Sequence, residues 1–251
     1  MPEATFSRAL ESSELPKRGA QAPSRRLCGR LCVCRPSRRC CVKWLYGLIM
    51  MLFFSVAIVL PVGLKVEANA VARANDTLSF YAGSTVCASN GSRREFYSEA
   101  AALLASFTPL HCGECGGCSS ARDLQIYNET RLTLTKSATR CALRVFFGGS
   151  SAVTRCFDQA IGFSAACTPC WVDNVLCDQR KCLFTCLWGL LRGEENNRDD
   201  APSELSACLK CDERLCGPAF IRCAGANRRR SGITSDIMRS TDQEMCRLSW
   251  S

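Results

Sequence analysis

The sequence from residue 167 to residue 186 is CTPCWVDNVLCDQRKCLFTC, with five cysteines in twenty positions. Cys167 and Cys170 are three residues apart, Cys170 and Cys177 are seven apart, and the last two cysteines are four apart. Such intervals put side chains on one face of a helix, from which cysteines project towards a neighbouring helix rather than towards each other. The stretch therefore predicts helices that are held to partner helices by disulfides.

A second cysteine array follows at residues 208–223, CLKCDERLCGPAFIRC, where Gly217-Pro218 puts a proline in the first turn of a helix. The two arrays, C-x2-C-x6-C-x4-C-x3-C and C-x2-C-x4-C-x6-C, are loosely alike, which hints at a duplication, but their intervals are permuted. Residues 193–203, GEENNRDDAPS, are expected to form an exposed acidic loop between the arrays.

Three apolar stripes with helical spacing precede the first array, and clean alternation of apolar and polar residues is nearly absent. Thr108-Pro109, Gly148-Gly149 and Gly162 follow them as stop signals. The expected fold class is therefore all-α. The stripes are Phe96, Ala100, Leu103, Leu104 and Phe107; Ala138, Cys141, Ala142, Val145 and Phe146; and Val153, Cys156, Phe157, Ala160 and Ile161.

Sixteen of the 21 cysteines lie beyond residue 86, an even number that predicts a disulfide framework in an oxidising compartment. Which cysteine pairs with which does not follow from the sequence. They are Cys87, Cys112, Cys115, Cys118, Cys141, Cys156, Cys167, Cys170, Cys177, Cys182, Cys186, Cys208, Cys211, Cys216, Cys223 and Cys246.

Residues Trp44–Leu64 form an uncharged apolar run of 21 residues, which as a helix is about 31 Å long and matches the hydrocarbon core of a bilayer. Residues 1–43 hold ten Lys/Arg against three Asp/Glu, whereas residues 65–251 are nearly balanced, with 22 against 20. Basic residues beside a span stay cytoplasmic, so we expect a single-pass protein with its N-terminus in the cytoplasm, in the plasma membrane or the endomembrane system. Cleavage as a signal peptide after Ala68-Asn69-Ala70 is the alternative. No basic face suited to nucleic acid is present.

Three N-glycosylation sequons begin at Asn75, Asn90 and Asn128, all on the expected lumenal side of the span. The expected organisation is a basic, disordered cytoplasmic tail (1–43), a signal-anchor helix (44–64), a glycosylated stalk (65–91) and a cysteine-rich helical ectodomain (92–251).

The other five cysteines crowd the cytoplasmic approach to the membrane, among arginines. Cysteines in this position are common S-palmitoylation sites, while free thiols in a disordered tail, or a metal site with an unusual spacing, are the alternatives. The palmitoylation candidates are Cys28, Cys32, Cys34, Cys40 and Cys41.

Residues 111–118, HCGECGGC, contain two overlapping CxxC units and the only histidine of the chain, His111. A redox dithiol, with a thiolate favoured by the imidazole, is one interpretation; a zinc site is another. No strand–helix context of the thioredoxin type is predicted, so we favour a glycine-rich loop held by structural bridges. A single histidine also excludes a Ser-His-Asp triad unless His111 is its base.

The remaining charged and aromatic residues favour structural interpretations. Asp199-Asp200 and Asp212-Glu213 are expected on solvated surfaces. The run Arg228-Arg229-Arg230 is either a solvated helix end or loop, a dibasic processing site, or a patch for an anionic ligand. Trp171 and Trp188 are expected to pack in the core against disulfides.

Three segments between His111 and Cys246 resemble cysteine-rich, membrane-anchored proteins of algae and other unicellular eukaryotes. They are HCGECGGCS (111–119), YNETRLTLT (127–135) and CGPAFIRCAGANRRRSGI (216–233). The resemblance covers about the distal half of the chain and implies no activity.

The sequence thus predicts an integral membrane protein, not an enzyme, whose disulfide-stapled ectodomain has a binding or structural role. A lumenal or extracellular protein or a glycan is the expected partner, and no cofactor, metal or nucleic acid is expected. The alternative is a lumenal thiol–disulfide oxidoreductase that uses Cys112, Cys115 and Cys118.

Overall fold

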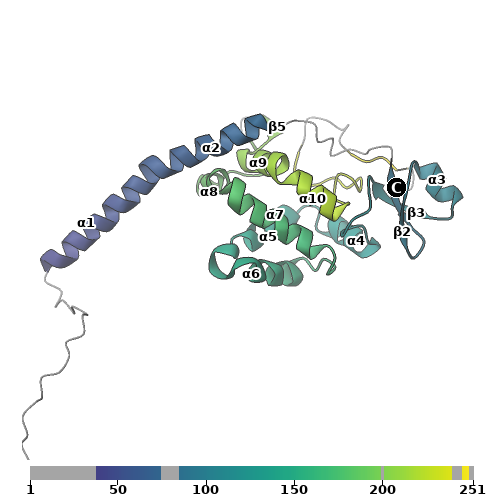
Figure 1. The fold of residues 1–251 in the computed structure, drawn as a ribbon, viewed down its shortest axis with the longest axis horizontal. Helices are drawn as coiled ribbons and strands as arrows, with labels where there is room; N and C mark the ends of the chain where they lie inside the picture. The colour runs from purple at the N-terminus through teal and green to yellow at the C-terminus, as the bar shows by residue number, and fades with distance from the viewer. Residues whose placement is uncertain (1–37, 75–84, 199–200, 239–244, 249–251) are drawn as a thin grey trace, which may run out of the picture. The chain divides into compact units, whose positions relative to one another are not determined.

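The computed structural model describes residues 38–74, 85–198, 201–238 and 245–248 (Figure 1). The chain divides into two compact units after Ile49. Most described residues are helical, but two small sheets are present, so the prediction of an all-α protein is only partly confirmed.

The apolar run lies in consecutive helical segments, α1 (Arg38–Phe54), the π-helical turn η1 (Ser55–Val59) and α2 (Leu60–Arg73). Among the described residues, one helix, Lys43–Arg73, is long and apolar enough to cross a membrane. The helix does not end at Leu64, so the first residues of the segment expected as a stalk are helical and pack against α8 and α9.

Four helices carry the two cysteine arrays: α7 (Thr168–Lys181), α8 (Leu183–Leu191), α9 (Ala207–Leu215) and α10 (Gly217–Ala224). Pro218 stands in the first turn of α10, as predicted. Four bridges join the arrays in nested order, and we call these helices and bridges the ladder. They are Cys170–Cys223, Cys177–Cys216, Cys182–Cys211 and Cys186–Cys208.

The nested order makes the two arms of the ladder antiparallel. The permuted intervals that suggested a duplication are nearly the same intervals in reverse order, x6, x4, x3 against x2, x4, x6. An antiparallel pairing of helices requires this reversal, because residues later in one arm meet residues earlier in the other. The ladder therefore accounts for the pattern without a duplication.

Three further helices pack on the ladder: α4 (Ala121–Glu129), α5 (Leu134–Ala142) and α6 (Val145–Ala160). Gly148 and Gly149 break the helical path within α6, and Gly149 has a φ of 58°, which favours glycine. Cys141–Cys156 ties α5 to α6. The core is centred on an aromatic cluster of Tyr127, Phe157, Phe163, Trp171 and Phe220.

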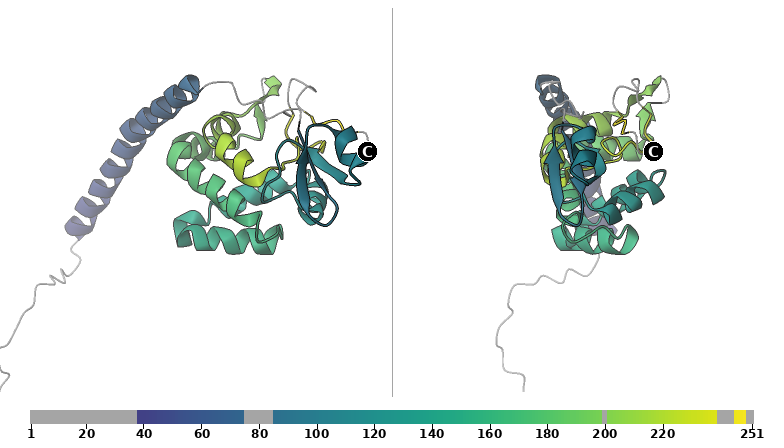
Figure 2. Two further views of the ribbon diagram at one scale, coloured as in Figure 1. Left: turned by 45° about the vertical axis from the view of Figure 1, so that its right-hand side comes forward. Right: turned by 90° about the vertical axis from the view of Figure 1, so that its right-hand side faces the viewer.

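A three-stranded antiparallel sheet lies at the far end of the helical part from α8 (Figures 1 and 2). Its strands are β1 (Val86–Ser89), β2 (Arg93–Phe96) and β3 (Thr108–Cys112), in the order β2-β1-β3. Pro109 is compatible with β3 because β3 is an edge strand, where a missing N–H costs no ladder bond.

The helix expected from Phe96 to Phe107 is therefore wrong. Only α3 (Glu99–Leu104) is helical, while Phe96 ends β2 and Phe107 precedes β3. Their rings pack 5.0 Å apart, so the two ends of the stripe are brought together by a turn and not by one helix face. Leu104, from the middle of the stripe, is 88% exposed.

The acidic segment between the arrays carries a short hairpin of β4 (Asn197–Arg198) and β5 (Ala201–Leu205). Ser206 then caps α9 through its side chain, which accepts a hydrogen bond from the Leu209 N–H.

Candidate functional site

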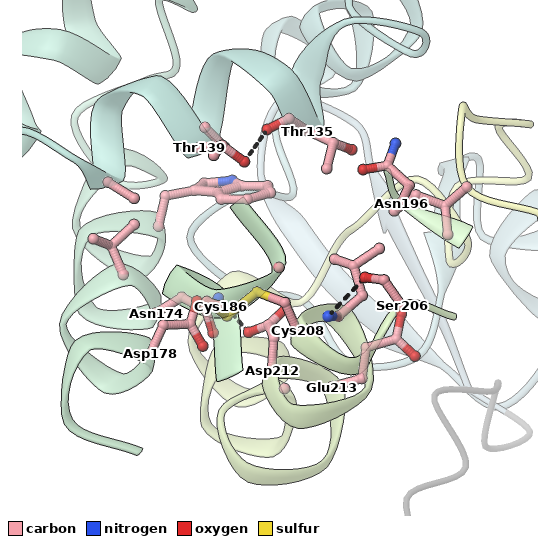
Figure 3. Close-up of a pocket in the computed structure, with 18 of the residues that line it drawn as sticks. Thr135, Thr139, Asn174, Asp178, Cys186, Asn196, Ser206, Cys208, Asp212 and Glu213 are labelled. Atoms are coloured by element: carbon pink, nitrogen blue, oxygen red, sulfur yellow. Dashed lines mark hydrogen bonds between the residues drawn. A yellow bond between two sulfur atoms is a disulfide. The ribbon is translucent and has the colours of Figure 1, made fainter. Parts of the chain in front are cut away.

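A cavity of about 300 Å³ opens between α5, α7, α8 and α9, and we call it the cleft (Figure 3). Loop residues from 194–196 and 227–237 complete its wall. Much of its apolar lining comes from α5 and the turn after it, the start of α6, α7 and α8. These residues are Ala138, Ala142, Leu143, Val145, Phe146, Trp171, Val175, Leu183, Leu187 and Leu190.

Two carboxyl groups meet in the cleft, Asp178 from α7 and Asp212 from α9. Asn174 donates a hydrogen bond from Nδ2 to Oδ1 of Asp212, at 2.8 Å. Burial raises the pKa of Asp178, and the negative charge of Asp212 raises it further; burial also raises the pKa of Asp212. The two acids therefore titrate as a pair, and the protonated form of Asp178 is favoured.

The expectation that Asp212-Glu213 lies on a solvated helix face is wrong. Asp212 is turned into the cleft. Glu213 forms an ion pair with Arg229 at 3.1 Å, and only 8% of the arginine side chain is exposed. Asp199-Asp200 lies outside the described residues.

Two residues of the arginine run, Arg228 and Arg229, line the cleft, so the run is not a solvated helix end. Arg228 pairs with Asp236 at 2.7 Å, with 12% of its side chain exposed, and donates to Thr135 Oγ1 at 3.0 Å. Arg230 donates to the Gly225 carbonyl at 3.0 Å. The run therefore joins the last described segments to α5, α9 and the end of α10.

Asp178, Cys182 and Cys216 lie close enough together to suggest a metal site. Both sulfurs are in bridges, with Cys211 and Cys177, and metal sites use thiolates. This group therefore offers no thiolate to a metal ion.

The loop from Cys112 to Cys118, which we call the glycine knuckle, sends each of its cysteines to a different distant partner. The bridges are Cys112–Cys246, Cys115–Cys87 and Cys118–Cys167. No bridge closes within the knuckle, and the sulfurs offered for a zinc site or a dithiol are all engaged. All sixteen distal cysteines are thus paired, and the predicted disulfide framework is confirmed.

His111 is fully buried beside the knuckle and holds its turn in place. Nδ1 donates to the Cys112 carbonyl at 2.9 Å, because a carbonyl can only accept, and Nε2 therefore accepts from Ser119 Oγ at 2.7 Å. Ser119 Oγ in turn accepts the Gly116 N–H at 2.7 Å. Burial lowers the pKa of His111 to about 4, so the ring is neutral.

The knuckle docks on the end of α10 through its backbone. Gly117 and Cys118 donate N–H groups to the carbonyls of Cys223 and Ala224, both at 2.8 Å. A Cβ on Gly116 would collide with the backbone of Ala224 and Gly225, so only glycine allows the approach.

The predicted modification sites are distributed as follows. Asn90 is exposed in the turn between β1 and β2, and Asn128 is exposed on α4. Asn75, Cys28, Cys32 and Cys34 lie outside the described residues, while Cys40 and Cys41 lie within α1. Trp171 packs in the aromatic core as expected, whereas Trp188 on α8 is partly exposed.

No local motif marks the cleft, because its walls come from segments between residues 127 and 237 that meet only in the folded chain. The nearest signal in the sequence is the placement of Asp178 and Asp212 each one residue from a ladder cysteine, Cys177 and Cys211. Once those helices are paired, the two acids must approach each other.

Comparison with known proteins gives one match: residues 150–248 fit the model of a family of unknown function (DUF8771). This range contains the whole ladder. No curated protein and no solved structure matches the chain.

Proposed function

We propose that the chain is a single-pass membrane protein whose disulfide-stapled ectodomain binds a ligand in the cleft. The N-terminus would be cytoplasmic, and the ectodomain would be outside the cell or in an endomembrane lumen. The carrying observation is a largely apolar cavity with a few converging polar groups and an acid pair of perturbed pKa, features typical of binding sites.

The disulfides and the span support the membrane placement together. Bridges at this density form in oxidising compartments, and the basic residues before the span favour a cytoplasmic tail. Asn90 and Asn128 are exposed, as acceptors of N-linked glycans must be.

We favour a binding role over thiol–disulfide exchange because the knuckle has no CxxC bridge of its own. A redox dithiol cycles between two thiols and a bridge that joins them. In the knuckle such a cycle would need to open bridges to Cys87, Cys246 or Cys167, which hold distant segments together.

Topology is the property to test first. Glycosidase treatment of the full chain should increase its gel mobility, and joint replacement of Asn75, Asn90 and Asn128 by Gln should abolish the shift. The C-terminus should be protected from protease in intact microsomes. Digestion of the C-terminus without detergent would contradict the proposal.

The tail cysteines are proposed as acylation sites. Hydroxylamine-sensitive acyl exchange should label the wild-type chain. Labelling that persists after Cys28, Cys32, Cys34, Cys40 and Cys41 are all changed to Ser would rule this out.

A further inference from the structure

We propose that the ligand of the cleft is the acyl chain of a membrane lipid, which enters from the outer surface of the bilayer that holds the span. The inference rests on the proposed function, since it names the ligand class of the same cleft. It follows from where α8 lies, from the mouth of the cleft and from its lining.

Helix α8 is fastened to the outer end of the apolar span. The Phe184 ring lies directly against Gly63, where an added Cβ would collide with it. The buried carboxylate of Glu67 accepts the N–H groups of Phe184 at 2.9 Å and Thr185 at 2.7 Å, so it caps the start of α8. Because Gly63 belongs to the run that crosses the bilayer, the start of α8 lies at the hydrocarbon boundary.

Helix α8 presents an apolar surface at this depth. Its sequence is LFTCLWGLL, without a charge, and its exposed residues include Trp188, Leu190 and Leu191. Tryptophan and leucine on a short helix are typical of an element that lies in the membrane interface. The apolar face of α8 is thus continuous with the span, and a lipid surface is the occupant that this continuity favours.

Residues of α8 and of the segment at the start of α6 border the opening of the cleft. Four exposed side chains line the cavity: Leu143 between α5 and α6, Phe146 of α6, and Leu187 and Leu190 of α8. Phe146 is 51% exposed and Leu190 is 45% exposed. Large apolar side chains with this exposure around an opening mark a route for an apolar ligand.

The lining also contains polar groups. Trp171 and Val175 continue the apolar wall, while Asn196, Ser206 and Glu213 supply polar atoms, as Figure 3 shows for the last three. A cavity of about 300 Å³ is at the small end of ligand pockets and suits one chain rather than a whole two-chain phospholipid. The apolar side chains of α5, α7 and α8 would contact the acyl chain, and polar groups of the same helices, Thr139 and Asp178 among them, would lie beside it.

Photo-cross-linking tests the inference in the full chain. The protein is reconstituted in phosphatidylcholine vesicles that contain a phospholipid with a diazirine near the end of one acyl chain, and adducts are mapped by mass spectrometry. We expect adducts on peptides of the span and, separately, on peptides that carry Leu143 or Phe146 and Leu187 or Leu190.

The positions of the adducts separate the possible failures. Adducts on the span alone would overturn the acyl-chain inference and leave the membrane anchor intact; this result is also expected if a protein partner covers α8. Absence of adducts from the span would contradict the proposed function itself.

Two variants and one control complete the experiment. Leu187→Glu puts a charge at the mouth and should lower the cleft adducts by about tenfold while span adducts persist, whereas Leu104→Glu, on the 88% exposed Leu104 of α3, should change neither. Ala142→Trp fills the cavity without adding charge, and should also remove the cleft adducts. Cleft adducts at wild-type yield in both variants would overturn the inference.

Discussion

The ladder and the glycine knuckle are both built from closely spaced cysteines, but they are closed in different ways. In the ladder, each arm contributes cysteines at helical intervals, and the partners follow in reverse order along the other arm, from Cys170–Cys223 to Cys186–Cys208. The three knuckle cysteines are also closely spaced in sequence, but each is bridged to a different element. Cys112 is bridged to the C-terminal segment, Cys115 to strand β1 and Cys118 to the residue before α7. Close spacing predicts a shared partner element only where the local backbone is a helix.

The two regions also depend on different interactions. The ladder combines side-chain packing with bridges that support one another, since each lies within a few residues of the next. The knuckle depends on backbone contact with α10 and on a buried, neutral histidine. We therefore expect the knuckle to be the more sensitive of the two to small substitutions.

A large effect is expected from Gly116→Ala. The new Cβ would overlap the backbone of Ala224 and Gly225, which cannot move without breaking the docking hydrogen bonds, so the chain should lose at least about 3 kcal/mol of stability. Thermal unfolding of the full chain in detergent, followed by near-UV circular dichroism, measures this. Gly91→Ala, which has a φ of 107° but open space around it, is the control and should cost about 1 kcal/mol. Equal losses would mean that the knuckle does not dock through its backbone.

Two bridges with nearly equal loops compare the regions directly. Cys87–Cys115 spans 28 residues and Cys182–Cys211 spans 29, and a loop of this size corresponds to about 3.6 kcal/mol in the chain-entropy model. Replacing both cysteines by alanine should cost nearly this amount for Cys87–Cys115. The ladder bridge should cost about 1 kcal/mol less, because Cys177–Cys216 and Cys186–Cys208 still restrain the unfolded chain. The denaturant midpoints of the two double variants measure this difference. Equal midpoints would show that the neighbouring ladder bridges do not compensate for the loss of Cys182–Cys211.

Acid should weaken the knuckle through His111. The unfolded histidine takes up a proton below a pH of about 6.5, whereas the folded one does so only below about 4. The unfolded state therefore binds more protons in this window, and stability falls as the pH is lowered, by about 3 kcal/mol in total. His111→Asn should be less stable at pH 7 but should lose this pH dependence. If the stability of His111→Asn falls as steeply as that of the wild type between pH 6.5 and 4, the folded histidine ring is not held neutral.

The acid pair of the ladder should respond in the opposite direction. Folded Asp178 keeps a proton that the unfolded chain releases above a pH of about 4, so this pair destabilises the fold as the pH rises. Asp178→Asn should raise the stability by about 1 kcal/mol at pH 8 and have little effect near pH 4. Asp173→Asn, at an exposed position of the same helix, is the control and should be neutral at both values.

Sequence patterns predicted the helical half better than the rest. Val153, Phe157 and Ala160 do lie on one helix that ends before Gly162, because these contacts are local in the chain. The sheet was missed because its strands are four or five residues long and one contains Pro109, so neither alternation nor composition could mark them. The helical spacing of the stripe from Phe96 to Phe107 is a coincidence. Its two ends meet because the chain turns back between β2 and β3.

The cleft was missed for a different reason. Asp212 and Glu213 look solvated in sequence, and become buried only because Asp178 and Arg229 arrive from segments more than fifteen residues away. The reversed intervals of the two arrays are compatible with antiparallel pairing, but the same intervals are also compatible with a duplication. Only the pairing of the helices distinguishes these two interpretations.

Disulfide mapping of the unreduced chain tests the difference between ladder and knuckle most directly. The protein is alkylated under denaturing but non-reducing conditions, digested, and its linked peptides are identified by mass spectrometry. We expect no alkylated cysteine beyond residue 86, four nested links across the ladder, and three links from the knuckle to Cys87, Cys167 and Cys246. Reactive thiols confined to Cys112, Cys115 and Cys118, or a link within that group, would contradict the structural role of the knuckle and favour a thiol–disulfide enzyme.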